Sequence, residues 1–94
     1  MSRLKWLPAA LEDLARLHRF LDSVSVDAAQ RAAGKILEGA NTLEQHPELG
    51  QPMADERREW FIPFAGGAYV LRHRIDAGGD PVVIRVWHSR ESRT

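Results

Sequence analysis

The segment 69–88, YVLRHRIDAGGDPVVIRVWH, decides the fold because it reads as two β-strands joined by a short turn. Apolar and polar residues alternate in both halves, as they do in strands that bury one face. The glycine-rich stretch DAGGDP between them is typical of a hairpin turn. The side chains expected to face the core are Tyr69, Leu71, His73 and Ile75 in the first strand and Val82, Ile84 and Val86 in the second.

Two further strand patterns lie outside this hairpin. REWFIPF at 58–64 alternates Trp60, Ile62 and Phe64 with polar or exposed positions, and AGGA at 65–68 predicts a turn into the next strand. RLKWL at 3–7 predicts a short, half-buried strand near the start of the chain. HPELGQP at 46–52 predicts a turn-rich connection, because Pro47 cannot continue a helix.

The residues between these strands have helical period. The segment 8–22 begins with Pro8, which suits a first helical turn, and Phe20 projects with Asp13 and Arg16 on its polar face. The stripe expected to be buried is Ala10, Leu11, Leu14, Leu17, His18 and Leu21. In the second helix, capped by Ser25 or Asp27, the shared face is Ala29, Ala32, Ala33, Ile36, Ala40 and Leu43.

These elements occur in the order β-α-α-β-β-β. The small residues of the second helix allow the two helices to approach closely as an antiparallel hairpin. We therefore expect an α+β fold in which a helical hairpin packs on one face of a small antiparallel sheet. With 94 residues, the chain is expected to form a single domain spanning residues 1–94.

Composition narrows the classes of function. Thirteen Lys and Arg balance thirteen Asp and Glu, so strong binding to nucleic acid by this chain alone is not expected. The chain has no cysteine, no apolar stretch approaching the ~20 residues of a membrane span and no signal peptide. These features predict a cytoplasmic protein without disulfides or membrane contact.

The sheet face away from the helices carries the first candidate binding site. Alternation places Arg72, Arg74, Arg85 and Trp87 on this face, with Arg90 just beyond it. One interpretation is a solvated face on which long arginine side chains cover Trp87. The other is a recognition surface, since Arg and Trp are enriched at binding hot spots.

His88 is the residue near the chain end with a pKa suited to acid–base chemistry. Ser89 follows it directly, and adjacent strand residues point to opposite faces, so the two form a poor nucleophile–base pair. A strand-end histidine with local hydrogen bonds is the alternative. His18 and His73 are expected to be semi-buried, and the four histidines have no metal-ligand spacing, so no metal or other cofactor is predicted.

An ordered series of motifs resembles the ParE branch of the RelE/ParE toxin superfamily. The series spans Trp6 to Arg90 and comprises A-x-x-D-L, then A…I…L…P-x-x-G-x-P, then Y-V-L-x-H-R-I and V-I-R-V-x-H-x-R. The resemblance implies the fold described above. It also implies a toxin of a type II toxin–antitoxin module, of the kind associated with plasmid stabilisation and growth arrest, with a ParD-like antitoxin as its partner.

The superfamily contains two activities. RelE-like members cut mRNA in the ribosome, whereas ParE-like members poison DNA gyrase. The nuclease branch typically has Arg after the Tyr of this strand, a Tyr near the chain end and a strongly basic composition. Here Val70 follows Tyr69, SRESRT ends the chain, and the net charge is zero. These departures favour a non-enzymatic gyrase inhibitor, while an mRNA endonuclease using His88 and Arg90 and a non-toxic, autoregulatory member remain alternatives.

Two sets of binding residues follow from this resemblance. The gyrase-binding candidates are Arg72, Arg74, Arg85, Trp87, His88 and Arg90. The antitoxin-binding candidates are Phe20, Arg16 and Leu17, because an exposed aromatic residue on the first helix can anchor an apolar segment of the antitoxin tail.

Overall fold

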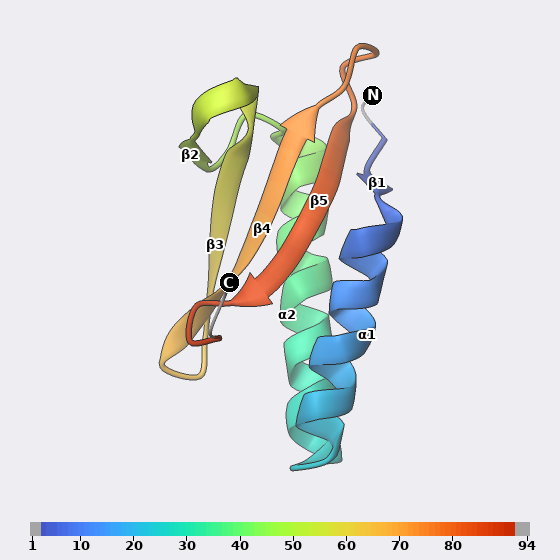
Figure 1. Cartoon of the computed structure of the whole chain (residues 1–94), viewed down its shortest axis with the longest axis vertical. Helices are drawn as coiled ribbons and strands as arrows, with labels where there is room; N and C mark the ends of the chain where they lie inside the picture. Colours follow the sequence, from blue (N-terminus) through green and yellow to red (C-terminus); the bar gives the residue numbers. More distant parts are fainter. Residues whose placement is uncertain (1–2, 92–94) are drawn as a thin grey trace.

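A computed structural model describes residues 3–91 and confirms the α+β architecture (Figure 1). Two helices pack side by side on one face of a five-stranded sheet whose order is β1-β5-β4-β3-β2. β1 runs parallel to β5, and the other neighbours are antiparallel. The elements are β1 (Lys5–Trp6), α1 (Pro8–Asp22), α2 (Val26–Gln45), β2 (Gln51–Pro52), the 3₁₀ turn η1 (Ala54–Glu56), β3 (Arg58–Phe64), β4 (Gly67–Ile75) and β5 (Pro81–His88).

The two-residue strand β2 was not predicted, because two residues are too short to show alternation. It forms the edge of the sheet beyond β3 and pairs Gln51 with Glu59. At the opposite edge, Lys5 Nζ of β1 lies 2.8 Å from Asp76 Oδ2 and 3.4 Å from Asp80 Oδ2. These contacts hold β1 beside the β4–β5 turn. The Lys5 ammonium, together with the backbone N–H groups of Asp80 and Gly78, lowers the pKa of Asp76 to about 2.

Helix α2 follows the sequence prediction closely. The Ser25 hydroxyl accepts a hydrogen bond from the Ala28 N–H at 3.1 Å and so caps its first turn. Its buried side chains are Ala29, Ala32, Ile36, Ala40 and Leu43. A Cβ at Gly39 would collide with the Ile62 side chain, so this glycine allows α2 to approach β3, whereas a Cβ at Gly34 would meet nothing within 4 Å.

Helix α1 has its predicted bounds, but its buried face is rotated from the predicted stripe. Asp13 is buried, with only 4% of its surface exposed, although the sequence pattern placed it on the polar face. Leu11 and His18 are exposed, so their predicted burial was wrong. The physical reason is that α1 lies along β5, where the Asp13 carboxylate accepts a backbone N–H of the strand.

A register shift in β5 explains a second departure. Leu71 pairs with Val86, but His73 pairs with Val83, so β5 contains one more residue than β4 across this step. Such a bulge reverses the alternation beyond it. Val83 and Val86 therefore belong to the core cluster, whereas the pattern had predicted Val82, Ile84 and Val86.

His73 is fully buried rather than semi-buried. Neither ring nitrogen makes a well-formed hydrogen bond with any of residues 3–91. Burial lowers the pKa of His73 below its ordinary value of 6.5. The nearby Leu49 backbone raises this pKa but does not cancel the effect of burial, and the positive charge of Arg58 lowers the pKa further. The folded protein therefore favours the neutral imidazole.

This burial predicts loss of stability in mild acid. As pH falls below 6.5, the unfolded chain binds a proton at His73 before the folded chain does, so the free energy of unfolding should decrease. The slope can approach about 1.4 kcal/mol per pH unit. Urea denaturation between pH 7.5 and pH 5 would measure it. His73→Leu should flatten the curve, and His18→Gln, at an exposed site, should not; equal slopes in all three proteins would contradict the assignment.

Candidate functional site

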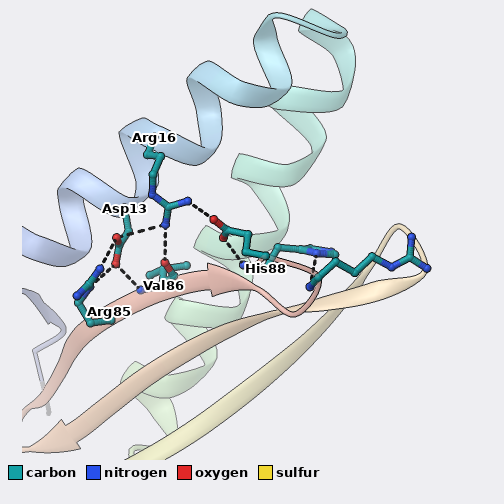
Figure 2. A network of polar contacts seen from close by, with 7 residues as sticks. Asp13, Arg16, Arg85, Val86 and His88 are labelled. Carbon is teal, nitrogen blue, oxygen red and sulfur yellow. Dashed lines mark hydrogen bonds and ion pairs between the residues drawn. The ribbon is translucent and has the colours of Figure 1, made fainter. Parts of the chain in front are cut away.

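Side chains of α1 cover the free edge of β5 (Figure 2). Within residues 3–91, the outer edge of β5 pairs with β1 only at Val82 and Val83. Farther along, Asp13 Oδ2 accepts the Val86 N–H at 2.8 Å, and Arg16 Nη2 lies 3.4 Å from the Val86 carbonyl oxygen. These two side chains thus take the place of a neighbouring strand.

Asp13 also binds Arg85, which corrects the predicted position of that arginine. Arg85 Nε and Nη2 donate to the two carboxylate oxygens of Asp13 at 2.8 and 3.1 Å, so the guanidinium turns toward α1 (Figure 2). Burial alone would raise the pKa of Asp13. Hydrogen bonds from Arg85, Val86 and Arg16 outweigh burial and hold the pKa of this carboxyl below its ordinary value.

Glu91 extends the same network beyond the strand. One of its oxygens accepts the His88 N–H at 2.7 Å, and the other accepts a hydrogen bond from Arg16 Nη1. Alternate outward N–H groups of β5, those of Val86 and His88, are therefore each bound by a carboxylate. The turn that follows β5 is tied back to α1 through Arg16.

His88 uses both ring nitrogens in local hydrogen bonds. The Arg90 N–H donates to Nδ1 at 3.2 Å, and Nε2 lies 3.2 Å from the Phe64 carbonyl oxygen. This pattern fits a neutral imidazole protonated at Nε2. The ring also packs edge-on against Tyr69 with centroids 5.0 Å apart. The neighbouring Ser89 hydroxyl accepts the Ala68 N–H at 3.0 Å, so it is not aligned with His88 as a nucleophile.

The outer sheet face carries an apolar row across three strands. Phe61 of β3 pairs with Val70 of β4, which pairs with Trp87 of β5. Val70 is buried beneath its neighbours, while 44% of Phe61 is exposed. The Arg72 guanidinium lies 5.0 Å from the centre of a Trp87 ring and donates to Glu59 Oε2 from Nε at 3.1 Å and from Nη2 at 2.7 Å. We call Phe61, Val70, Arg72 and Trp87 the outer-face row.

The six gyrase-binding candidates do not form one cluster. Only Arg72 and Trp87 lie together on the outer face. Arg85 and His88 contact residues on the helix side, and Arg90 Nη2 donates to the Gly66 carbonyl at 3.1 Å. Arg74 pairs with Val82 at the far end of β4, about 13 Å along the strand from Val70.

The three antitoxin-binding candidates line one groove. It lies between α1 and the end of the sheet and has a volume of about 560 Å³. Phe20 lines the groove with 68% of its surface exposed, whereas Leu17 lines it but is itself buried in the core. The remaining lining residues are Arg16, Leu21, Phe64, Ala65, Tyr69, His88, Arg90 and Glu91.

The described part of the chain has neither a metal-binding cluster nor a membrane-spanning helix. Residues 3–91 contain no cluster of three or more His, Asp or Glu side chains that could hold a metal ion. No helix among them is both long and apolar enough to cross a membrane.

Comparison with known proteins identifies the relatives of this chain. Residues 4–93 match the family model described as "ParE toxin of type II toxin-antitoxin system, parDE". The chain is 40% identical to "Toxin RelE3" of Caulobacter vibrioides, over 99% of this chain and 100% of that protein. It is 38% identical to "Toxin RelE1" of the same organism, over 89% of each chain.

A solved structure shows the same fold. The structure titled "Chromosomal ParDE TA system from P. aeruginosa" superposes with a TM-score of 0.78 at 21% sequence identity, covering 94% of this chain and 96% of that chain. The family match over nearly the whole sequence and the two relatives above 30% identity agree with this likeness. The chain therefore belongs to the ParE toxin family, within the RelE/ParE superfamily of type II toxin–antitoxin systems.

Proposed function

We propose that this type II toxin acts without chemistry of its own, by binding DNA gyrase and stabilising the gyrase complex in which the DNA is cleaved. The observation that carries this proposal is the outer-face row. Its centre consists of three paired residues on adjacent strands, Phe61, Val70 and Trp87, none of which has a titratable side chain. An apolar aromatic surface flanked by Arg72 suits docking to a protein better than proton transfer.

The environment of His88 supports the same proposal. A general acid or base must reach the reacting proton, but both ring nitrogens of His88 already contact the backbone. Arg90, the second residue of the nuclease hypothesis, is directed to the Gly66 carbonyl. Neither side chain is aligned with the other for catalysis.

A ribosome-dependent mRNA endonuclease is the second candidate, because the curated relatives are named RelE toxins. Purified toxin can be tested in both reactions. With gyrase, ATP and supercoiled DNA we expect trapped cleavage complexes, visible as linear DNA after the gyrase is digested. With ribosomes and mRNA we expect no codon-dependent cuts. Such cuts would overturn the gyrase proposal, and absence of both effects, with no growth arrest, would indicate the non-toxic alternative.

We infer that an apolar segment of the cognate antitoxin occupies the groove beside Phe20. The groove has mainly apolar walls, and a largely exposed Phe20 stands at its margin. Arg90 also lines it, so an anionic side chain of the antitoxin could pair with the Arg90 guanidinium.

The groove gives a direct prediction for antitoxin binding. Phe20→Ala should weaken binding by about 2 kcal/mol or more, the usual effect of truncating a desolvated hot-spot aromatic residue. Titration calorimetry with purified antitoxin would measure the change. Val24→Ala is the matched control, since Val24 is 74% exposed and does not line the groove. Unchanged affinity of the Phe20 variant would remove this residue from the interface.

A further inference from the structure

A second, positively charged hollow lies at the opposite end of the sheet from Trp87. It is formed where β2 and η1 meet the start of β3 and the end of β4, and its volume is about 310 Å³. Three arginines line it, Arg57, Arg58 and Arg74. Pro47, Pro52, Met53 and Ile75 supply aliphatic walls, and Glu56 is the single acidic residue in the lining.

The charges of this hollow are poorly compensated within the described residues. Arg74 makes no side-chain hydrogen bond or ion pair with any of residues 3–91. Arg57 Nη2 is 3.7 Å from a carboxylate oxygen of Asp55, which is itself largely exposed, and Arg57 Nε is buried without a partner among these residues. Arg58 donates only to the Gly50 carbonyl, at 3.2 Å.

The strand register brings two of these cations together. Arg58 and His73 form the last pair of the β3–β4 ladder, and Arg57 and Arg74 are the next residues on the two sides. Like charges directly opposite one another on neighbouring strands repel. The preceding Asp55 and Glu56 have φ angles of 64° and 60°, a left-handed conformation that non-glycine residues rarely adopt. Strained backbone of this kind clusters at binding sites, and here it directly precedes Arg57, which lines the hollow.

We propose that this hollow binds an aspartate or glutamate side chain from an acidic peptide segment of a partner protein. Guanidinium groups pair with carboxylates in a bidentate geometry, and the aliphatic walls suit the methylene groups and neighbours of such a side chain. Because Pro52 has no N–H, the two-residue edge strand β2 is poorly suited to pairing with an added strand. The partner segment therefore inserts a side chain into the hollow and does not add a strand to the sheet.

The composition of the hollow favours a peptide over nucleic acid. Its lining contains no aromatic side chain on which a base could stack, and the chain as a whole has a net charge of zero. None of the residues of the hollow belongs to the outer-face row, so the inference does not rest on that row.

The test uses the isotopically labelled full chain and three probes. These are a blocked hexapeptide of alternating Glu and Leu, the same peptide with Gln in place of Glu, and a short DNA duplex. In amide NMR spectra the Glu peptide should shift the signals of 53–58 and 74–75 to saturation. The Gln peptide should bind the parent chain at least about tenfold more weakly than the Glu peptide does. The Glu peptide should bind the Arg57→Gln and Arg74→Gln double variant more weakly by a similar factor.

Arg31→Gln is the matched control, because Arg31 is an exposed helical arginine paired with Asp27. It should leave the titration unchanged, and circular dichroism should show that the double variant is folded. Equal binding of the Gln and Glu peptides, or no shift with the Glu peptide, would overturn the proposal. Tighter binding of the duplex at the same amides would assign the hollow to phosphate instead.

Discussion

Replacing Trp87 and Arg90 together by alanine is expected to abolish the growth arrest caused by this toxin. Trp87 supplies the largest side chain of the outer-face row, and Arg72 stacks over it at 5.0 Å. An interfacial Trp and its cationic neighbour are the residue types whose loss most often costs more than about 2 kcal/mol of binding. Arg90 holds the turn beyond β5 against Gly66, so its removal also loosens the end of the proposed target surface.

The measurement is growth after induction of the toxin without its antitoxin. The double variant should remain folded, because Trp87 and Arg90 lie outside the core cluster between helices and sheet, and circular dichroism would verify this. Leu37→Ala is the control, since Leu37 is an exposed apolar residue on the helical hairpin with 52% exposure. Growth arrest by a folded double variant would show that the toxic surface lies elsewhere, and Arg57, Arg58 and Trp60 would be examined next.

The elements of the fold could be read from the sequence wherever periodicity was long and uninterrupted. α2 illustrates this, since its cap at Ser25 and its buried alanines follow from residue type and spacing alone. The face of β5 could not be read in the same way. A one-residue bulge reverses the alternation and exchanges Val82 for Val83 in the core cluster, and no local pattern marks the extra residue.

The candidate site was predictable only in part. The pairing of Trp87 with Arg72 on the outer face follows from alternation, and the exposure of Phe20 follows from the helical stripe. The carboxylates that organise the site were missed, because their partners are distant in sequence. Asp13 binds Val86 across 73 positions, and Glu91 binds Arg16 across 75. The available signal was Asp13 bordering the apolar stripe, where a buried carboxylate requires donors.

Replacing Asp13 by alanine is expected to be the most destabilising change of a polar residue in this chain. Asp13 accepts hydrogen bonds from Val86, Arg85 and Arg16 while almost completely buried. Its loss leaves the Val86 N–H at an uncovered strand edge and two arginines without their shared anion. We expect the free energy of unfolding to fall by about 2–4 kcal/mol, a large share of the roughly 5–15 kcal/mol typical of a domain. Urea denaturation at pH 7 would measure it.

Two variants separate the roles of Asp13. Asp13→Asn keeps an acceptor for Val86 but removes the charge, so it should cost less than Asp13→Ala, about 1–2 kcal/mol. Asp27→Ala breaks an exposed pair with Arg31 on the same helical hairpin and should cost less than about 1 kcal/mol. A loss in Asp13→Ala no greater than that in Asp27→Ala would contradict the structural role of the network.

The pH dependence of the same proteins provides an independent readout. The pKa of Asp13 is lowered in the folded state, so its contribution to stability is present above its ordinary value of 3.8 and disappears as pH falls through the lower folded value. Asp13→Ala should lack this acid-dependent loss. Since Asp13 and Arg16 also cover the edge of β5, the alanine variant exposes the backbone groups of Val86 to other strands. We therefore expect it to self-associate at concentrations where the parent chain and Asp27→Ala do not, which analytical ultracentrifugation would detect.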